Sequence, residues 1–577
     1  MRKLLGFFKS YRLQATAAPL FKFMEATLEL IVPLIISSII DTGIAARDTG
    51  FIVSRGLILV LFAVVGFALS ATAQYFSARS AIGVCASVRQ ALFDKIQRFD
   101  FTRLDETGAS TLETRLTSDV NALETGINLT LRLLLRSPFV VFGAMIVAFT
   151  IDAKCALIFA LVIAVLLAIV FLILFASVPR HTLVQRELDS ITRAARENLA
   201  GVRVIRAFGL EESEKAEFSE RSARLEKRQL AVGRISAKLN PATLVAVNIA
   251  AIILIYSGAL RVDGGVLTQG KVVALYNLLA QILVELVKTA TLVITLSRSA
   301  ASLKRINAVL DSPEGEKGGG AIPKNDAPRG RIEFKNVGFT YKNAGAPSLC
   351  DISFVAESGQ KIGVIGGTGS GKSTLAGLIA GFYYATDGEV LIDGVNVREF
   401  DSEALTERVS VVPQRAALIE GSIRTNLLMG KKDANDAELI KALETAQAAE
   451  FVNRLENGLD ASVVRGGANF SGGQKQRLSI ARALVKPSEI LILDDSMSAL
   501  DHATDAKLRR VLDEQTEKRT LVMITQRAVS IMDADLIIVL DEGQCVGMGR
   551  HNELLDSCRV YREIYEMQTG GEGVLPA

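Results

Sequence analysis

The chain has 577 residues, of which 49% are hydrophobic, and it contains no tryptophan. That length accommodates several domains, and that apolar fraction is too high for a single soluble globule, so we expect a membrane portion. The 65 basic and 62 acidic side chains leave a formal net charge of +3, without the excess of basic residues that a nucleic-acid-binding surface needs, so we expect no nucleic-acid partner.

Six apolar stretches follow one another in the first half of the chain, at about 18–42, 52–78, 126–150, 155–178, 239–261 and 271–297. Each has roughly 20 residues or more, which is enough for a helix to cross the hydrocarbon core of a bilayer. The alternative, buried helices of a soluble protein, is disfavoured because 156–178 carries no charged residue. The first apolar stretch follows a mixed segment ending near Leu20, so we expect an N-terminus that is retained rather than cleaved as a signal peptide.

The links between these stretches are unequal. Those at 43–51, 151–154 and 262–270 are short, whereas 79–125 and 179–238 are long and have a helical pattern. Basic residues are frequent in 180–238 and at the N-terminus, and the positive-inside rule places such segments in the cytoplasm. The sequence therefore predicts a multi-pass protein of the cell inner (plasma) membrane, with both termini and the C-terminal domain cytoplasmic.

The character of the chain changes after the sixth stretch. Segment 311–330 is rich in glycine, proline and charge and is typical of a linker. Short β-branched runs then alternate with helical patterns over 331–568, which predicts an α/β domain with a largely parallel sheet. We therefore expect a membrane domain over 1–310, an α/β domain over 331–568 and a frayed tail over 569–577. Five scattered cysteines fit packing residues in a reducing compartment.

The strongest local motif is GGTGSGKS at 366–373, between a strand-like run and a helix-like segment. This is the pattern of a P-loop, whose backbone amides surround phosphate groups, and its context disfavours a chance glycine turn. Lys372 is then expected to reach the outer phosphates, while the Ser373 hydroxyl and Asp494, at the end of the run 490–494, are expected to hold Mg²⁺. The predicted ATP-binding residues here are Gly366, Gly367, Thr368, Gly369, Ser370, Gly371, Lys372, Ser373 and Thr374.

The segment FSGGQ at 470–474, followed by KQRLSIARAL, resembles the signature of ATP-binding cassette (ABC) proteins. The resemblance extends over essentially the whole chain, to exporter half-transporters of the multidrug and lipid-export type. It implies six transmembrane helices with long cytoplasmic extensions, fused to an α/β P-loop cassette, with coupling helices near 101–107 and 208–217. It also implies roles for Tyr341 (stacking on adenine), Gln414 (sensing Mg²⁺), Ser498 and Asp501 (an interface loop), and Ser471, Gly472, Gly473 and Gln474 (the signature that completes a partner's ATP site).

Two residues depart from the family pattern. Asp495 follows Asp494 where the family usually has the catalytic glutamate, and Gln526 stands where the family usually has a switch histidine that contacts the γ-phosphate. The aspartate is one methylene shorter than glutamate, and a misplacement of about 1 Å costs on the order of 10²-fold in rate. Glutamine donates only a neutral hydrogen bond. Harmless drift is the alternative, but both changes affect the same γ-phosphate chemistry while the P-loop is complete.

Cassettes of this family dimerise head to tail, so each nucleotide lies between the P-loop of one chain and the signature of the other. We therefore expect a heterodimer with a second ABC half-transporter, in which this chain's own site binds ATP but cleaves it slowly. Its substrate is expected to be a small molecule, lipid or peptide, hydrophobic or amphipathic. The alternatives are a homodimeric transporter of low ATPase activity, a regulatory or channel protein on the exporter scaffold, and a P-loop enzyme of another class anchored in the membrane.

Several charged residues fall within or near the apolar stretches, where ionisable groups are costly unless they face protein or water. We expect either a structural network between helices or contact with substrate. Asp41 resembles acidic residues that help to close the outer gate of heterodimeric exporters. The other charged residues are Glu25, Glu29, Arg132, Arg136, Glu285 and Lys288.

Overall fold

The computed structural model describes residues 2–315, 319–321, 329–342, 344–513 and 519–569. Its internal contacts divide the chain into two units, each described by itself below. The membrane unit comprises Met1–Lys95 and Ser110–Ser312, and the cassette unit comprises Ile96–Ala109 and Pro313–Ala577. Residues 316–318 and 322–328 of the predicted linker 311–330, and 570–577 of the predicted tail, lie outside the described residues.

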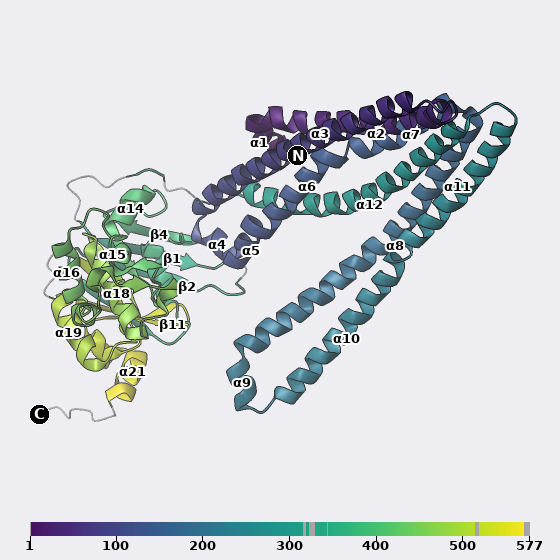
Figure 1. The fold of residues 1–577 in the computed structure, drawn as a ribbon. Coiled ribbons are helices and arrows are strands. Elements are labelled where there is room, and N and C mark those ends of the chain that lie inside the picture. Colours follow the sequence, from purple (N-terminus) through teal and green to yellow (C-terminus); the bar gives the residue numbers. More distant parts are fainter. Residues whose placement is uncertain (1, 316–318, 322–328, 343, 514–518, 570–577) are drawn as a thin grey trace, which may run out of the picture. The chain divides into compact units, whose positions relative to one another are not determined.

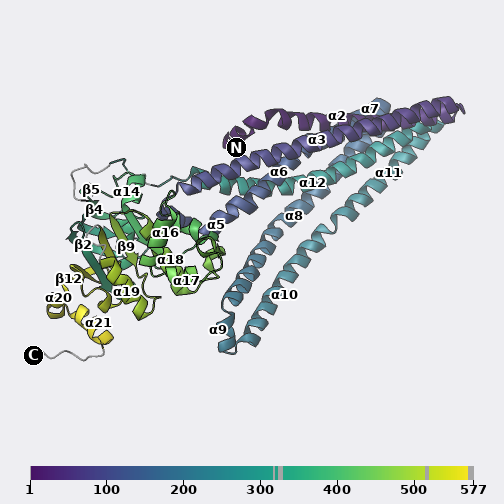
Figure 2. The ribbon, with the colours of Figure 1, turned by 60° about the vertical axis from the view of Figure 1, so that its left-hand side comes forward.

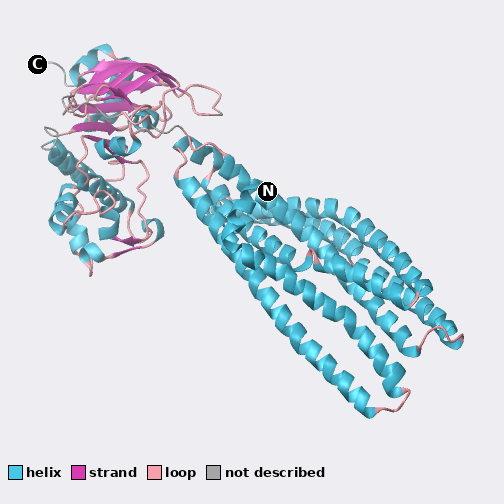
Figure 3. Cartoon of the chain, turned by 90° about the horizontal axis from the view of Figure 1, so that it is seen from above, coloured by secondary structure: helices cyan, strands magenta, loops and turns pink. Residues whose placement is uncertain are grey.

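The described residues of the membrane unit form helices and no strands (Figure 3). The predicted six spans are confirmed, because six helical stretches are long and apolar enough to cross a bilayer: Leu4–Ile44, Thr49–Gln97, Ala109–Ile151, Ala153–Ala200, Glu211–Asp263 and Gln269–Asp311. The helices are α1 (Arg2–Phe7), η1 (Phe8–Tyr11), α2 (Arg12–Ser38), η2 (Ile39–Ile44), α3 (Thr49–Gln97), α5 (Ala109–Thr114), η3 (Arg115–Asp119), α6 (Val120–Leu133), α7 (Arg136–Ile151), α8 (Ala153–Ala200), α9 (Val202–Ala207), α10 (Glu211–Ser236), α11 (Leu239–Asp263) and α12 (Gln269–Asp311).

These stretches have 41 to 53 residues, which at 1.5 Å per residue is roughly twice the thickness of a hydrocarbon core. The long links predicted from the sequence are therefore continuations of the spanning helices. Helix α8 runs out to the short α9, and α10 and α11 return beside it (Figures 1 and 2). Helix α12 contacts α2, α6, α7, α8 and α11, and apolar side chains such as Phe159, Leu254 and Ile282 are fully buried among them.

The second predicted coupling segment, 208–217, is not a short helix. Its first residues form the turn between α9 and α10, and its remainder is the start of α10 at Glu211. Gly209 has φ of 64°, a left-handed conformation that favours glycine and ends a helix. The short helix is therefore α9, which ends at Ala207.

The described residues of the cassette unit form three sheets. The largest has the order β12-β11-β3-β10-β9-β6. In it β11, β3, β10, β9 and β6 run parallel to one another, as predicted, and β12 is antiparallel to β11. A four-stranded antiparallel sheet, β2-β1-β4-β5, and the pair β7-β8 were not predicted. The strands are β1 (Ile332–Phe339), β2 (Leu349–Ala356), β3 (Lys361–Gly366), β4 (Asp387–Ile392), β5 (Val395–Asn396), β6 (Val409–Val412), β7 (Gly421–Ser422), β8 (Ser462–Val463), β9 (Ile490–Asp494), β10 (Thr520–Ile524), β11 (Leu536–Asp541) and β12 (Gln544–Gly549).

The register of the parallel sheet brings the ends of three strands together. Ile524 of β10 lies opposite Asp494 of β9 on one side and opposite Val364 of β3 on the other. The segments that follow these strands therefore leave the sheet at one edge. The helices of this unit are α4 (Phe101–Thr107), α13 (Lys372–Ile379), α14 (Ser402–Arg408), α15 (Ile423–Leu427), α16 (Asp436–Thr445), α17 (Ala449–Asn453), η4 (Gly458–Asp460), η5 (Arg465–Gly467), α18 (Gly472–Val485), α19 (His502–Asp513), η7 (Ala528–Ser530), α20 (His551–Ser557) and α21 (Arg559–Thr569).

The first predicted coupling segment, 101–107, forms helix α4 and packs within the cassette unit. The Asp100 carboxylate accepts a hydrogen bond from the Arg103 amide at 2.8 Å and caps the helix. The Phe101 ring stacks on Phe382 with centroids 4.3 Å apart. Helix α4 is thus attached to the residues that follow α13.

Candidate functional site

The P-loop residues form a continuous strand, turn and helix. All residues of β3 are buried, and the turn passes through Gly369 and Gly371, which have φ of 84° and 98°. A Cβ atom at Gly371 would lie 2.6 Å from the Ser348 carbonyl oxygen, so a larger residue does not fit there. The predicted residues brought together in this way are Gly366, Gly367, Thr368, Gly369, Ser370, Gly371, Lys372, Ser373 and Thr374.

The ammonium group of Lys372 lies inside the turn. It donates hydrogen bonds to the carbonyl oxygens of Gly366 (2.9 Å) and Gly367 (2.5 Å). Burial lowers the pKa of Lys372, although the nearby carboxylates of Asp495 and Asp494 act in the opposite direction. A dehydrated cation at a helix N-terminus is suited to binding an anionic oxygen.

Ser373 and Asp494 meet at the edge of the sheet. The Ser373 hydroxyl donates to the Asp494 carboxylate at 3.0 Å. Burial raises the pKa of Asp494, and the charge of Asp495 adds to that effect. A hydroxyl and a carboxylate are ligands that Mg²⁺ accepts, and this cation usually takes its remaining ligands from water and substrate phosphates. The two side chains therefore fit the ion that the sequence implies.

Tyr341 follows β1 and lies beside the helix that begins in the P-loop. Its hydroxyl is 3.1 Å from the Thr374 hydroxyl. Its ring makes edge contacts with Phe339 and Tyr383, at centroid distances of 4.8 and 5.3 Å. The predicted aromatic is thus half-buried in a group of rings next to α13.

The two residues that depart from the family pattern share a cavity of about 500 Å³. Asp495 follows β9, and its amide donates to the Ile524 carbonyl at 2.8 Å. Gln526 follows β10 two residues later. Ser498, Asp505, Arg509, Arg527, Val529, Ser530 and Gln568 complete the lining.

Asp495 has φ of 44°, a left-handed conformation that is uncommon for a residue with a Cβ atom. Gln414 donates from its amide to the Asp495 carboxylate at 3.4 Å. The predicted magnesium-sensing glutamine therefore contacts the predicted water-positioning residue directly. Asp495 directly follows Asp494, the last residue of β9, so this contact lies at the same edge of the sheet.

The predicted interface loop begins at the same place. The Ser498 hydroxyl donates to the Asp495 carbonyl at 2.8 Å. The Asp501 carboxylate accepts from the Thr504 amide (2.9 Å) and hydroxyl (2.8 Å) at the start of α19. Asp501 thus stabilises the end of the loop as a helix cap.

The signature residues lie at the N-terminus of the 14-residue helix α18. The Ser471 hydroxyl accepts from the Gln474 amide at 3.3 Å, and the Gln474 side chain accepts from the Ser471 amide at 2.9 Å. Ser471 and Gly472 are exposed. The helix therefore presents an ordered, accessible N-terminus, at which the helix dipole favours anions.

Sequence reasoning missed Gln568, which lines the same cavity as Asp495 and Gln526. It lies near the end of α21, directly before the segment that the sequence presents as a frayed tail. No local sequence motif identifies Gln568, because the residues that it contacts, Ala528 and Gln526, are 40 and 42 positions earlier in the chain.

Four of the predicted charged residues, Glu29, Arg136, Glu285 and Lys288, form a network between helices of the membrane unit. Arg136 of α7 pairs with Glu285 of α12 at 2.5 Å and with Glu29 of α2 at 2.6 Å. Lys288 and Ser137 also donate to Glu285, at 2.8 and 2.9 Å. The structural interpretation of these charges, one of the two left open by the sequence, therefore has direct contacts in its favour.

Asp41 and Glu25 have local partners. Asp41 accepts from the Gly270 amide at 2.7 Å and from the Thr268 hydroxyl at 2.6 Å, at the start of α12. Glu25 pairs with Lys22 at 2.5 Å. The role of Asp41 at an outer gate stays a prediction, but within this chain it holds the start of the sixth span.

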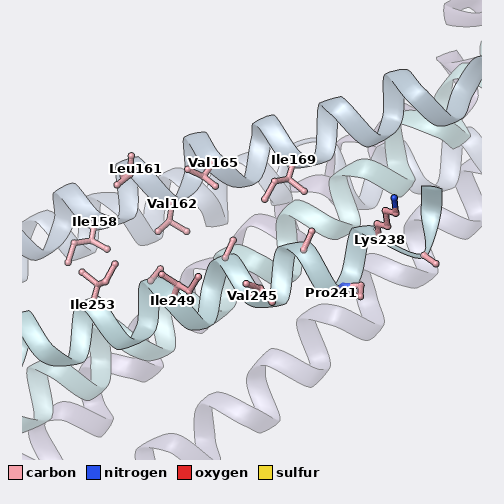
Figure 4. Close-up of a pocket in the computed structure, with 14 residues that line it drawn as sticks. Ile158, Leu161, Val162, Val165, Ile169, Lys238, Pro241, Val245, Ile249 and Ile253 are labelled. Atoms are coloured by element: carbon pink, nitrogen blue, oxygen red, sulfur yellow. The ribbon is translucent and has the colours of Figure 1, made fainter. Parts of the chain in front are cut away.

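A second cavity, of about 830 Å³, lies between α8 and α11. Figure 4 shows Ile158 and Val162 on α8 facing Ile249 and Ile253 on α11. The lining is almost entirely apolar, apart from the end near Lys238. Such a surface suits lipid chains or other apolar groups rather than catalysis.

Comparisons with known proteins relate both units to one class. A family model described as the ABC transporter transmembrane region matches residues 16–286, and one described as ABC transporter matches residues 349–498. An uncharacterized ABC transporter ATP-binding protein of Bacillus subtilis, YfiB, is 33% identical and covers 99% of both chains. An ATP-dependent lipid A-core flippase of Chromobacterium violaceum is 28% identical over 98% of this chain and 97% of its own. The solved structure of a bacterial Atm1-family ABC exporter with ATP bound has the same fold, with a TM-score of 0.81, 22% identity, and coverage of 98% of this chain and 99% of that one.

Proposed function

This chain belongs to the ABC transporter family, and from that premise we propose that it is one half of a heterodimeric exporter whose own ATP site hydrolyses slowly. Membership of the family and the exporter fold imply ATPase-coupled transport across a membrane. The observation that carries the finer proposal is the shared cavity of Asp495 and Gln526. The two residues that differ from the family pattern line one cavity, while the P-loop and the signature have all the residues that the family pattern requires.

ATP is bound, in this proposal, by the P-loop and Tyr341. The amides of the turn and Lys372 contact the phosphates, and the Tyr341 ring stacks on adenine. Ser373, Asp494 and Gln414 hold Mg²⁺, which supplies charge neutralisation between the outer phosphates. Without nucleotide, the Lys372 ammonium group donates to two carbonyl oxygens of the loop. When ATP binds, it therefore exchanges these acceptors for phosphate oxygens.

Hydrolysis at this site is slow because two groups are changed. Asp495 carries its carboxylate one methylene closer to the backbone than glutamate does, so water is oriented poorly for in-line attack. Gln526 cannot carry a positive charge toward the γ-phosphate. Together these changes leave a site that holds ATP and turns it over rarely.

The second ATP site of the pair is completed by this chain's signature. Ser471, Gly472, Gly473 and Gln474 offer the N-terminus of α18 to the γ-phosphate held by the partner's P-loop, and Ser498 and Asp501 belong to the loop between the cassettes. A partner with the usual glutamate and histidine then hydrolyses ATP at that site.

The transported substrate is proposed to be hydrophobic or amphipathic. The similarity to a lipid A-core flippase supports a substrate of that kind, as does the apolar cavity between α8 and α11. The basic residues of 180–238 support a cytoplasmic position for the cassette and both termini, in a cell inner (plasma) membrane. Helix α4 is the coupling element, since it is part of the membrane half in sequence and packs with the cassette in space.

Two other functions use the same fold. A homodimer with two slow sites would be a transporter of low ATPase activity, and a regulatory or channel protein would conduct without hydrolysis. The complete signature favours the heterodimer over both, because a signature that serves only slow sites has no catalytic use.

The test is an asymmetric pair of substitutions in the complex purified through a tag on this chain. Lys372→Ala removes a residue of this chain's own site, and Gly473→Asp introduces a negative charge into the signature that serves the partner. We expect a second ABC chain at equal stoichiometry, ATPase activity that survives Lys372→Ala in large part, and loss of activity with Gly473→Asp. Isolation of this chain alone, turning over at about 10 s⁻¹ as a typical enzyme does, would contradict the proposal.

A further inference from the structure

The last helix of the chain reaches the loop that carries Gln526. The side-chain amide of Gln568, in α21, donates from Nε2 to the Gln526 carbonyl oxygen at 2.6 Å. Its Oε1 accepts from the Ala528 amide at 2.8 Å. One amide group thus satisfies an acceptor and a donor on the backbone of the same loop.

Helix α21 is itself fixed in the cassette core. Tyr561 is fully buried, and its hydroxyl is 2.8 Å from Nδ1 of His551 in α20. Ile564 and Tyr565 pack against the same hydrophobic core. Gln568 follows Tyr561 by about two helical turns, which places both on one face of the helix. The amide of Gln568 is therefore held by a rigid element.

The other contacts of the loop come from nearer parts of the site. The Arg527 amide donates to the Thr525 hydroxyl at 3.0 Å, and Arg509 donates to the Val529 carbonyl at 3.0 Å. The first contact restrains the N–H of the peptide group that follows Gln526, but neither contact pairs the Gln526 carbonyl oxygen or the Ala528 amide, which Gln568 binds. Ala528 is completely buried, and without Gln568 its amide would lose the hydrogen-bond partner that the structure shows.

We infer that Gln568 is a positioning residue for Gln526, and that the C-terminal helix is thereby part of the γ-phosphate machinery of this chain. By fixing the Gln526 carbonyl and the Ala528 amide, Gln568 sets the direction in which the Gln526 side chain leaves the loop. The inference rests on the proposed function in one respect, that Gln526 faces the γ-phosphate. It predicts that changes at Gln568 affect ATP but not ADP.

The experiment measures the dissociation constants of ADP and of the non-hydrolysable analogue AMP-PNP on the full-length protein in nanodiscs. Gln568→Met removes both hydrogen bonds at similar side-chain length, and Gln568→Glu keeps only the acceptor for the Ala528 amide. Met567→Ala is the matched control, because Met567 is next in the helix and 83% exposed. Losing two hydrogen bonds is expected to weaken AMP-PNP binding about fivefold in Gln568→Met, with ADP binding unchanged. At least the same loss is expected in Gln568→Glu, because its carboxylate faces the Gln526 carbonyl oxygen.

A double-substitution cycle separates positioning from general damage. Gln526→Ala is expected to weaken AMP-PNP binding by itself, and Gln568→Met is expected to add little to it, because both act through one side chain. Equal losses for ADP and AMP-PNP, unchanged binding in Gln568→Met, or additive effects in the cycle would each overturn the inference. Turnover is not measured, so a chain that hydrolyses ATP rapidly alone would refute the slow site and leave this result intact.

Discussion

The Tyr383 hydroxyl donates a 2.7 Å hydrogen bond to the Asp105 carboxylate, although the two residues are 278 positions apart. Burial and the Asp105 carboxylate both raise the pKa of Tyr383, so the phenol remains a donor at physiological pH. Lys342 adds an ion pair to Glu106 at 2.6 Å, and this contact holds the pKa of Glu106 below its usual range. Helix α4 is therefore attached to the rest of the cassette unit by an aromatic contact, a hydrogen bond and an ion pair.

The Tyr383 contact can be tested by Tyr383→Phe, which removes the hydrogen bond and keeps the ring. One hydrogen bond contributes about 1 kcal/mol, so amide hydrogen exchange in 96–109 is expected to accelerate about fivefold. The measurement is exchange detected by mass spectrometry on the full-length protein. Tyr384→Phe, at the next position, is the control, and equal acceleration in both variants would contradict the assignment.

Restoring the usual residues at the cavity is expected to restore hydrolysis. Asp495→Glu with Gln526→His should raise phosphate release at this chain's own site by about tenfold or more, since misplacement by about 1 Å costs on the order of 10²-fold. The assay is single-turnover phosphate release with the partner's site inactivated. Asp495→Asn serves as the matched control that retains shape without charge, and an equal gain there would sink the slow-site explanation.

The buried pair in the membrane unit should respond differently to single and double substitution. Side chains of Arg136 and Glu285 are 7% and 4% exposed, so Arg136→Leu leaves the buried Glu285 carboxylate with only Lys288 and Ser137 as partners. This loss is expected to destabilise the protein by up to about 3 kcal/mol. Arg136→Leu with Glu285→Leu should recover at least half of that loss. Thermal unfolding in detergent measures both. Arg221→Leu breaks the more exposed pair Arg221–Glu217 and should cost less than about 1 kcal/mol.

The cassette should lose stability in mild acid through His551. Burial lowers the pKa of His551 below its ordinary value of 6.5, so the folded state binds fewer protons than the unfolded state once the pH falls through 6.5. The stabilisation from neutral His551 is therefore complete above pH 6.5 and is lost as the pH falls toward the lowered value. Between pH 7.5 and 5.5 we expect the melting temperature of the cassette to fall about 2 °C more in the native chain than in His551→Gln. An equal fall in both would remove His551 from the explanation.

The elements that the sequence predicted correctly are those specified by local patterns. The P-loop was recognised because its glycines, Lys372 and Ser373 stand between a strand and a helix. The six spans were recognised because predominantly apolar runs of that length are rare outside membranes. The bounds of α4 were obtained from the family resemblance and agree with the structure.

The features that were missed depend on contacts between distant segments. Strands β1, β2 and β4 pair antiparallel across long loops, and a short alternating run does not reveal its partner. The contacts of Gln568 and the pairing of Arg136 with both Glu29 and Glu285 also join separate elements. The second coupling segment was misplaced because Gly209, rather than the charge pattern that follows it, ends the short helix.

The position of α4 has a practical consequence for dissecting the protein. A soluble fragment beginning at residue 331 would lack Phe101, Asp105 and Glu106, and would open the aromatic face at Phe382 and Tyr383 to water. Such a fragment would be prone to self-association. A nucleotide affinity measured on it would be that of a cassette unit lacking residues 96–109. A faithful truncation has to supply 96–109 again, as a tethered or added peptide, since the cassette is assembled from two separated parts of the gene product.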